Sequence, residues 1–379
     1  MRLDRVGVVS TVAVLAALAG CAPNSGTPTP QGSTAVRKGG DGRTGEYDVV
    51  ASWWKPAPNH DARWTWGQVS GLAVDNPNRI LVVTRGDWPP DRPRVITSRG
   101  DMRRSNFIVV ADSTGKIVET WSQWDSLFTL PHQIYINPYD PERSVWVTES
   151  GGTGQHLVLK FSNDGKRLLM KLGDPNNPKT RDAARANPNP NPHEFGWPST
   201  LAFLPNGDFL LADGYWNSRI VRYAADGKLI REWGKLGKGP GEFDLLHGTA
   251  VDRDGRVYQG DRTNGRIEIF DANGKFIEEW SDVTDPVNVY IDENDAVWVL
   301  SATRHRIMKY NRRGELQYWF GTYGTDWPGG LSRPHQMDVD QNGVLYIANY
   351  DGGWVNKFVP KRGADPAKLI GRPLRLGSK

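Results

Sequence analysis

The feature that most constrains the fold is a repeat of six copies, each built from short β-rich segments around turns of Asp, Asn and Gly. One element of the repeat is a pair of apolar strands, which begins at Leu72, Ile134, Leu201, Thr249, Val289 and Met337. The other is a hairpin that ends in an aromatic or apolar residue, at Trp121, Leu172, Trp233, Trp280 and Trp319. No segment has a convincing helical period. Such self-similarity indicates a repeat architecture.

Two hairpins per copy give four strands per unit, and six units around an axis form a β-propeller, which protects its strand edges by circular closure. The sequence therefore predicts an all-β, six-bladed propeller over residues 46–360 and a C-terminal tail at 361–379. The sixth copy lacks its last strand, and we predict that segment 47–54 completes this blade and locks the ring. The spacing and turns resemble NHL-repeat propellers. Two tandem β-domains are the alternative, which the unbroken repeat disfavours.

The first 45 residues differ from the repeat. Residues 1–20 carry two arginines before an apolar stretch that is too short to span a bilayer, which is typical of a secretory signal peptide. The junction Leu18-Ala-Gly-Cys21 resembles the bacterial lipobox, in which the cysteine is lipidated and becomes the mature N-terminus. Residues 21–45 are almost wholly Pro, Gly, Ser, Thr and charged, which predicts a flexible tether. An ordinary signal peptide with a chance cysteine is the alternative.

These segments predict an extracytoplasmic, bacterial cell-envelope lipoprotein that is anchored to a membrane through Cys21. Because Cys21 is the single cysteine, no internal disulfide is expected. The net charge is +4, from 47 Lys and Arg against 43 Asp and Glu, and no basic run reaches five residues. This excludes a nucleic-acid-binding footprint. We expect a monomer that takes a small-molecule or peptide-like substrate.

Histidine follows the repeat. The copies align on the residue that ends their first apolar strand, namely Asp75, Asn137, Leu204, Asp252, Asp292 and Asp340. Five places earlier stand Ser70, His132, Ser199, His247, Val287 and His335. Because the start of the innermost strand lines the central channel, histidines in alternate blades lie about 120° apart around the axis. The three imidazoles are expected to converge on one point.

Three neutral nitrogen ligands with an open fourth position are what a catalytic zinc requires. The alternative is that His132, His247 and His335 are packed channel residues that hydrogen-bond to strand backbones. Their shared register favours the metal. The other four histidines do not share it and are expected on the surface or in loops: His60, His156, His193 and His305. Of these, His193 lies close to the start of the third blade.

The loops after the second apolar strand are expected at the same channel mouth, and they contain Arg85, Tyr215 and Arg262. A tyrosine beside a zinc ion and arginines loses its proton more readily and can serve as a general base. The arginines can bind a substrate carboxylate in a forked geometry. The alternative is that they pair with Asp87 and Asp261 and only fasten loops.

Several of these segments resemble the peptidyl-α-hydroxyglycine α-amidating lyase domain, over roughly residues 66–358. The matching segments are Val69–Asp75, Arg85–Asp87, Leu130–His132, Ala212–Ile220, Leu246–His247, Asp261–Ile267 and Arg333–His335. The resemblance implies that His132, His247 and His335 bind zinc, that Tyr215 is the catalytic tyrosine and that Arg85 and Arg262 are the active-site arginines. It also implies a possible structural calcium, bound largely by backbone carbonyls.

The chain departs from that family in three respects. Trp216 stands where vertebrate members have a disulfide cysteine, every other disulfide is lacking too, and the chain has no copper monooxygenase domain. Two insertions, at 86–106 and 174–198, are expected near the mouth, where they can reshape the pocket for a different substrate.

Three functions are compatible with these observations. The first is a zinc lyase that cleaves a carbinolamide-type C–N bond into an amide and an aldehyde such as glyoxylate, with Tyr215 as base. The second is a non-catalytic, envelope-anchored propeller that binds a protein or polymer. The third is another propeller enzyme, such as a lactonase or a streptogramin-type lyase, whose ligand sets differ from this histidine register.

Overall fold

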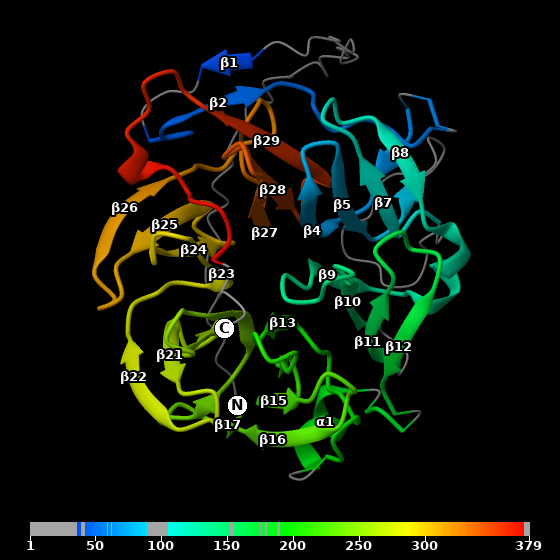
Figure 1. Ribbon diagram of the computed structural model, residues 1–379, viewed down its shortest axis with the longest axis vertical. Coiled ribbons are helices and arrows are strands. Elements are labelled where there is room, and N and C mark those ends of the chain that lie inside the picture. Colours follow the sequence, from blue (N-terminus) through cyan, green and yellow to red (C-terminus); the bar gives the residue numbers. More distant parts are fainter. Residues whose placement is uncertain are drawn as a thin grey trace, which may run out of the picture. The chain divides into compact units, whose positions relative to one another are not determined.

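The structure is a computed structural model. It describes residues 36–38, 42–58, 60–61, 63–88, 105–151, 155–174, 176–178, 180–187 and 190–374. Within the unit Ser33–Lys379, these residues form six antiparallel sheets around a central axis (Figure 1). The predicted all-β, six-bladed propeller is therefore confirmed. The proposed signal peptide, Cys21, most of the tether and most of the first insertion lie outside the described residues.

Five blades are four-stranded sheets in chain order from the axis outwards. Blade 1 contains β4 (Val69–Asn76), β5 (Arg79–Thr84), β7 (Ile108–Ala111) and β8 (Ile117–Thr120). Blade 2 contains β9 (Pro131–Ile136), β10 (Val145–Ser150), β11 (His156–Phe161) and β12 (Leu168–Leu172). Blade 3 contains β13 (Thr200–Phe203), β14 (Phe209–Asp213), β15 (Arg219–Tyr223) and β16 (Leu229–Trp233).

The same pattern continues in the next two blades. Blade 4 contains β19 (Leu246–Val251), β20 (Val257–Asp261), β21 (Arg266–Phe270) and β22 (Phe276–Trp280). Blade 5 contains β23 (Pro286–Ile291), β24 (Val297–Ser301), β25 (Arg306–Tyr310) and β26 (Leu316–Phe320). The inner strands are mostly buried, whereas the outermost strands are more exposed, as in β22, where partly buried and exposed residues alternate.

Blade 6 closes the ring with strands from both parts of the chain. Its inner strands are β27 (Pro334–Val339), β28 (Leu345–Asn349) and β29 (Trp354–Pro360). β2 (Tyr47–Val50) pairs antiparallel with β29, and β1 (Val36–Lys38) adds a fifth strand outside it. The prediction that the N-terminal segment completes the last blade is confirmed.

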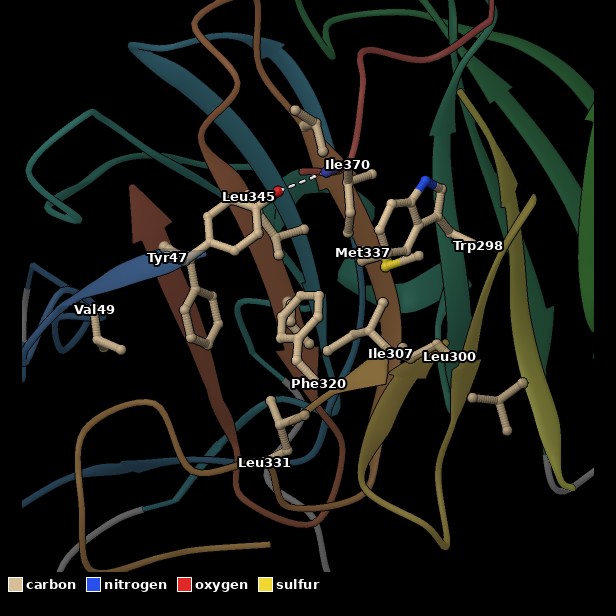
Figure 2. Packing of buried hydrophobic residues seen from close by; sticks show 14 of the residues in the cluster. Tyr47, Val49, Trp298, Leu300, Ile307, Phe320, Leu331, Met337, Leu345 and Ile370 are labelled. Carbon is tan, nitrogen blue, oxygen red and sulfur yellow. Dashed lines mark hydrogen bonds between the residues drawn. The ribbon is translucent and has the colours of Figure 1, made fainter. Parts of the chain in front are cut away.

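The hydrophobic core lies between the blades, as six clusters that each join two neighbours. The cluster between blades 5 and 6 contains the closing residues Tyr47 and Val49, which are 0% and 1% exposed. The Tyr47 ring lies 5.6 Å from that of Phe320, and its hydroxyl accepts a hydrogen bond from the Ile370 backbone N–H at 2.8 Å (Figure 2). The C-terminal tail thus also packs on the closing strand.

The outer hairpins turn where the Asp/Asn–x–x–Gly pattern predicts. In blade 1, an Asp112 carboxylate oxygen accepts hydrogen bonds from the backbone N–H groups of Thr114 and Lys116, at 2.8 and 3.1 Å. Gly115 adopts φ +83°, and a Cβ there would collide with the Trp53 carbonyl. The carboxylate therefore satisfies backbone N–H groups of the turn, and glycine adopts the left-handed backbone conformation that the turn requires.

The remaining elements are short. β3 (Thr65–Trp66) pairs with β6 (Asp87–Trp88), and β17 (Lys235–Leu236) pairs with β18 (Glu242–Phe243). The 3₁₀ helices are η1 (Ser122–Leu127) and η2 (Pro366–Lys368), and α1 (Arg181–Ala186) lies in the second insertion. Among the described residues, no helix has the length and apolar character that crossing a membrane requires.

In blades 2, 4 and 6, a residue at or next to the end of the second strand fastens the turn that leads into the first strand. In blade 2 this residue is Glu149, which is fully buried and accepts the backbone N–H groups of Thr129 and Leu130 at 3.1 and 2.8 Å. In blades 4 and 6, Asp261 and Asn349 bind backbone N–H groups in the same way. Burial raises the pKa of Glu149 to about 8, although its hydrogen bonds oppose the shift.

The closing strand provides the first prediction. Tyr47→Phe removes the acceptor of the Ile370 N–H, which we expect to lower the free energy of unfolding by about 1 kcal/mol. Tyr47→Ala also leaves a cavity and is expected to cost about 3–5 kcal/mol. Urea unfolding of the purified protein measures both. Tyr323→Ala, at a tyrosine that is 59% exposed, is the control, and equal losses at both sites would contradict the role of Tyr47 in closure.

Glu149 provides a pH-dependent prediction. Because the folded-state pKa is raised to about 8, the native protein binds more protons than the unfolded chain between about pH 5 and 8. The contribution of Glu149 to stability is therefore expected to fall as pH rises through this range, with each pKa unit corresponding to about 1.4 kcal/mol. Urea unfolding at pH 5, 6.5 and 8 tests this. Glu149→Gln is expected to remove this contribution, so that stability falls less steeply or rises more steeply with pH than in the wild type, and an unchanged slope would contradict the assignment.

Candidate metal centre

Three histidines occupy the same place in alternate blades. His132, His247 and His335 are each the second residue of an innermost strand, in β9, β19 and β27. They are 2%, 0% and 4% exposed. The ring closure of the propeller directs them toward the axis, as the repeat register predicts.

The three side chains converge on one point. Their ring centroids are 4.7, 4.8 and 4.8 Å apart, and one nitrogen from each ring lies within 4.8 Å of the others. The Nε2 atoms of His132 and His247 are 3.1 Å apart. Among the described residues, this is the cluster of His, Cys, Asp and Glu side chains that could hold a metal ion.

Each histidine is oriented by the backbone of the next blade. Nδ1 of His132 donates to the Ser199 carbonyl at 2.7 Å, and Nδ1 of His335 donates to the Ser70 carbonyl at 2.6 Å. Nδ1 of His247 donates to the Val287 carbonyl in the same way. The acceptors are the residues that hold the histidine register in blades 1, 3 and 5. Since a carbonyl only accepts, Nδ1 carries the proton and each neutral ring leaves Nε2 with a bare lone pair.

The protonation state suits a metal ligand. Burial lowers the pKa of His132 to about 3 and that of His247 and His335 well below the usual range, and nearby arginines add to the effect. Two unprotonated nitrogens 3.1 Å apart repel each other unless a cation lies between them. Backbone bonds at Nδ1 that leave Nε2 free are the usual orientation of metal-ligating histidines. The residues therefore form a possible metal site.

Tyr215 lies directly beside this cluster. Its hydroxyl is 3.1 Å from Nε2 of His132, and its ring lies 5.7 Å from that of His247. Burial raises the pKa of the phenol, whereas the charges of Arg262, Arg85 and Arg333 lower it. The phenol is therefore positioned next to the point where the histidines converge.

The two predicted arginines also reach the site, but with different partners from those considered in the sequence. Arg262 forms an ion pair with Asp285 of blade 5, and Asp261 pairs with Arg266 at 2.9 Å instead. Asp87 lies 3.1 Å from Nε2 of His60 and does not pair with Arg85. Among the described residues, neither pairing of the alternative interpretation is present, because each carboxylate contacts another basic side chain on a neighbouring strand or loop.

Among the described residues, no carboxylate forms an ion pair with Arg85. Its Nη1 donates to Gln68 at 3.2 Å, and its guanidinium lies 4.7 Å from the centroid of the Tyr350 ring. The buried Nε atom has no hydrogen-bond partner in the described part of the chain.

Tyr350 is a site residue that sequence reasoning missed. It follows Asn349 at the end of β28, as Arg85 follows Thr84 and Arg262 follows Asp261. The signal was therefore available in the repeat alignment, at the position after the second strand. The Tyr350 ring lies 5.2 Å from the ring of His335.

Three residues at the mouth adopt positive φ angles directly before a proline. These are Trp197, Asp285 and Arg333, with φ of 59°, 49° and 53°. Such angles are unusual for bulky residues and for residues that precede proline. Each side chain braces a site residue: the Trp197 ring lies 5.5 Å from that of Tyr215, Asp285 pairs with Arg262, and the Arg333 guanidinium lies 5.6 Å from the Tyr350 ring.

The remaining histidines lie elsewhere. His60 and His305 lie outside the strands, and His193 reaches the carbonyl of Gly227 at 3.2 Å, on an outer turn of blade 3. His156 is different, because it is fully buried at the start of β11 and donates to the Phe195 carbonyl. The expectation of a surface or loop position was therefore wrong for His156, which packs against Trp216 under the second insertion.

Known proteins resemble this chain in sequence. Peptidyl-glycine alpha-amidating monooxygenase A of Xenopus laevis is 34% identical over 78% of this chain and 32% of its own length. Peptidyl-alpha-hydroxyglycine alpha-amidating lyase 1 of Drosophila melanogaster is 32% identical over 48% of this chain and 32% of its own length. NHL repeat-containing protein 3 of Homo sapiens is 27% identical over 83% of this chain and 84% of its own length. No family profile matches the chain.

Solved structures share the fold alone. A virginiamycin B lyase of Staphylococcus aureus aligns with a TM-score of 0.52 at 16% identity, over 88% of this chain and 90% of its own. A gluconolactonase of Xanthomonas campestris aligns with a TM-score of 0.53 at 13% identity, over 84% of this chain and 91% of its own.

The chain spans about a quarter to a third of the length of the amidating monooxygenases that it matches. The chain is therefore a six-bladed β-propeller homologous to the peptidylglycine alpha-amidating enzymes and to the NHL repeat-containing proteins.

Proposed function

We propose that this protein is a zinc-dependent lyase that cleaves a carbinolamide-type C–N bond, as in a peptidyl-α-hydroxyglycine. The observation that carries the proposal is the convergence of His132, His247 and His335, each oriented through Nδ1, beside the hydroxyl of Tyr215. The named activity of a homologue, an α-hydroxyglycine amidating lyase, supports the same reaction class.

The donor set supports zinc as the metal. Three neutral imidazoles with an open side are a catalytic zinc set, whereas calcium prefers oxygen ligands. The three Nε2 atoms would hold the ion, and the Tyr215 hydroxyl lies 3.1 Å from one of them. When bound, zinc supplies a Lewis acid that polarises a substrate oxygen. The structural calcium that the family resemblance implies stays a prediction.

The protein's own groups would carry the remaining steps. Arg85 would orient a substrate carboxylate at the mouth, and Arg262 would place its charge next to the phenol of Tyr215. Tyr215 accepts the proton of the substrate hydroxyl as the carbon–oxygen double bond forms and the C–N bond breaks. The electron pair of the broken bond passes to the amide nitrogen, which takes up the proton that Tyr215 has accepted, so that Tyr215 returns to its starting state. The products are a primary amide and an aldehyde acid such as glyoxylate.

The proposal extends to the place of action. Lipidation at Cys21 would anchor the protein to a bacterial membrane through a flexible tether, so that the propeller, as a monomer, faces an extracytoplasmic space. Its substrate there would be a small molecule or a modified peptide.

A second candidate is a non-catalytic propeller that binds a protein or polymer. The observation in its favour is the match to NHL repeat-containing protein 3 over 84% of that protein, a wider share than any amidating relative described above. A wild-type protein that binds no metal would favour this candidate.

Metal binding is the first test. We expect about one zinc per chain in the purified protein after zinc is added, and none in the triple variant His132→Ala, His247→Ala, His335→Ala. Elemental analysis measures the stoichiometry. His305→Ala, at a loop histidine outside the cluster, is the matched control. Wild-type protein that takes up no zinc would contradict the lyase proposal.

Tyr215→Phe tests the base. Because a positioned general base contributes about 10²–10⁴ in rate, we expect turnover of N-benzoyl-α-hydroxyglycine to fall by that factor while zinc content stays unchanged. Release of glyoxylate measures turnover. Tyr323→Phe controls for loss of a hydroxyl, and full activity of Tyr215→Phe would show that another group accepts the proton.

A further inference from the structure

The three side chains that follow the second strands of blades 1, 4 and 6 form two different kinds of pair. Arg262 is bound by the carboxylate of Asp285, which neutralises it. Arg85 instead lies over the face of Tyr350, with 4.7 Å between its guanidinium and the ring centroid. An aromatic face attracts a guanidinium through its quadrupole but carries no net charge.

We propose that Tyr350 is a positioning residue that holds Arg85 over its ring and so makes Arg85, rather than Arg262, the receptor for the substrate carboxylate. The inference rests on the proposed lyase function, whose substrate carries a carboxylate. It divides the work of the two arginines: Arg85 binds the anion, whereas the Arg262–Asp285 pair acts on Tyr215.

The contacts of Arg85 support this division. Its Nε is buried and has no hydrogen-bond partner among the described residues, which leaves a donor for an incoming carboxylate. Its one side-chain hydrogen bond in that part of the chain is to the neutral amide of Gln68. The buried carboxyl that interacts with Arg85 at longer range is Glu149, whose pKa burial raises to about 8, so that it is largely protonated at neutral pH.

One backbone contact and two ring contacts hold Tyr350 in place. Its backbone N–H donates to the Arg333 carbonyl at 3.0 Å, and the Arg333 guanidinium lies 5.6 Å from the ring. The ring also lies 5.2 Å from that of His335. The Arg85 guanidinium is thereby held over a ring that itself lies beside His335, a proposed metal ligand.

Binding of glycolate to the zinc-loaded, full-length protein tests the proposal by calorimetry, without turnover. We expect Tyr350→Leu to weaken glycolate binding about tenfold and Tyr350→Phe, which keeps the aromatic face, to stay within about twofold of wild type. Tyr350→Met is a second non-aromatic variant. Tyr323→Leu, at an exposed tyrosine, is the matched control.

A double-mutant cycle shows whether Tyr350 acts through Arg85. Arg85→Gln is expected to weaken glycolate binding at least as much as Tyr350→Leu, and adding Tyr350→Leu to it is expected to cause no further loss. Arg262→Gln is expected to leave glycolate binding within about threefold of wild type.

Three results would overturn the proposal. They are additive losses in the cycle, glycolate binding that does not depend on Arg85, and a Tyr350→Leu protein that loses zinc affinity while its zinc-loaded fraction binds glycolate normally. The last result would assign Tyr350 to support of His335. Glyoxylate release by the wild-type protein is measured separately, so failure of the lyase function is distinguishable from failure of this inference.

Discussion

The hydrogen bond from each channel histidine to the main chain of the next blade connects the fold to the site. His132, His247 and His335 bond in turn to the carbonyls of Ser199, Val287 and Ser70. These bonds cross three of the six junctions between blades. The last runs from blade 6 to blade 1, across the junction that unites the C-terminal and N-terminal parts of the propeller. Any change in blade spacing would therefore move both the imidazoles and their proton positions.

This dependence explains why closure of the ring matters for chemistry as well as for stability. With no internal disulfide, closure relies on β2 pairing with β29 and on Tyr47 packing between blades 5 and 6. The C-terminal tail adds to this packing through Ile370. Because inner strands of neighbouring blades pack against each other, loosening the closing strand would also displace the residues at the axis.

The repeat made both the fold and the histidine cluster predictable, because one register position recurs at one radius in every blade. The same alignment contained Tyr350, at the position of Arg85 and Arg262, but a tyrosine among arginines gave no chemical pattern to follow. The acceptors of the Nδ1 protons were unpredictable, since they are backbone carbonyls and leave no trace in side-chain identity. The partner of Arg262 lies in the next blade, and its position depends on the positive φ of Asp285.

The charges at the mouth connect metal binding with anion binding. Three neutral imidazoles supply no negative charge for a divalent cation, and Arg85, Arg262 and Arg333 add positive charge nearby. Asp285 offsets Arg262, and Asp351 lies 3.8 Å from Arg333, whereas Arg85 has no such carboxylate among the described residues. A carboxylate that binds Arg85 would therefore compensate both this guanidinium and the proposed metal. By linkage, each would then strengthen the binding of the other. A site of this composition favours an anionic substrate over a neutral one.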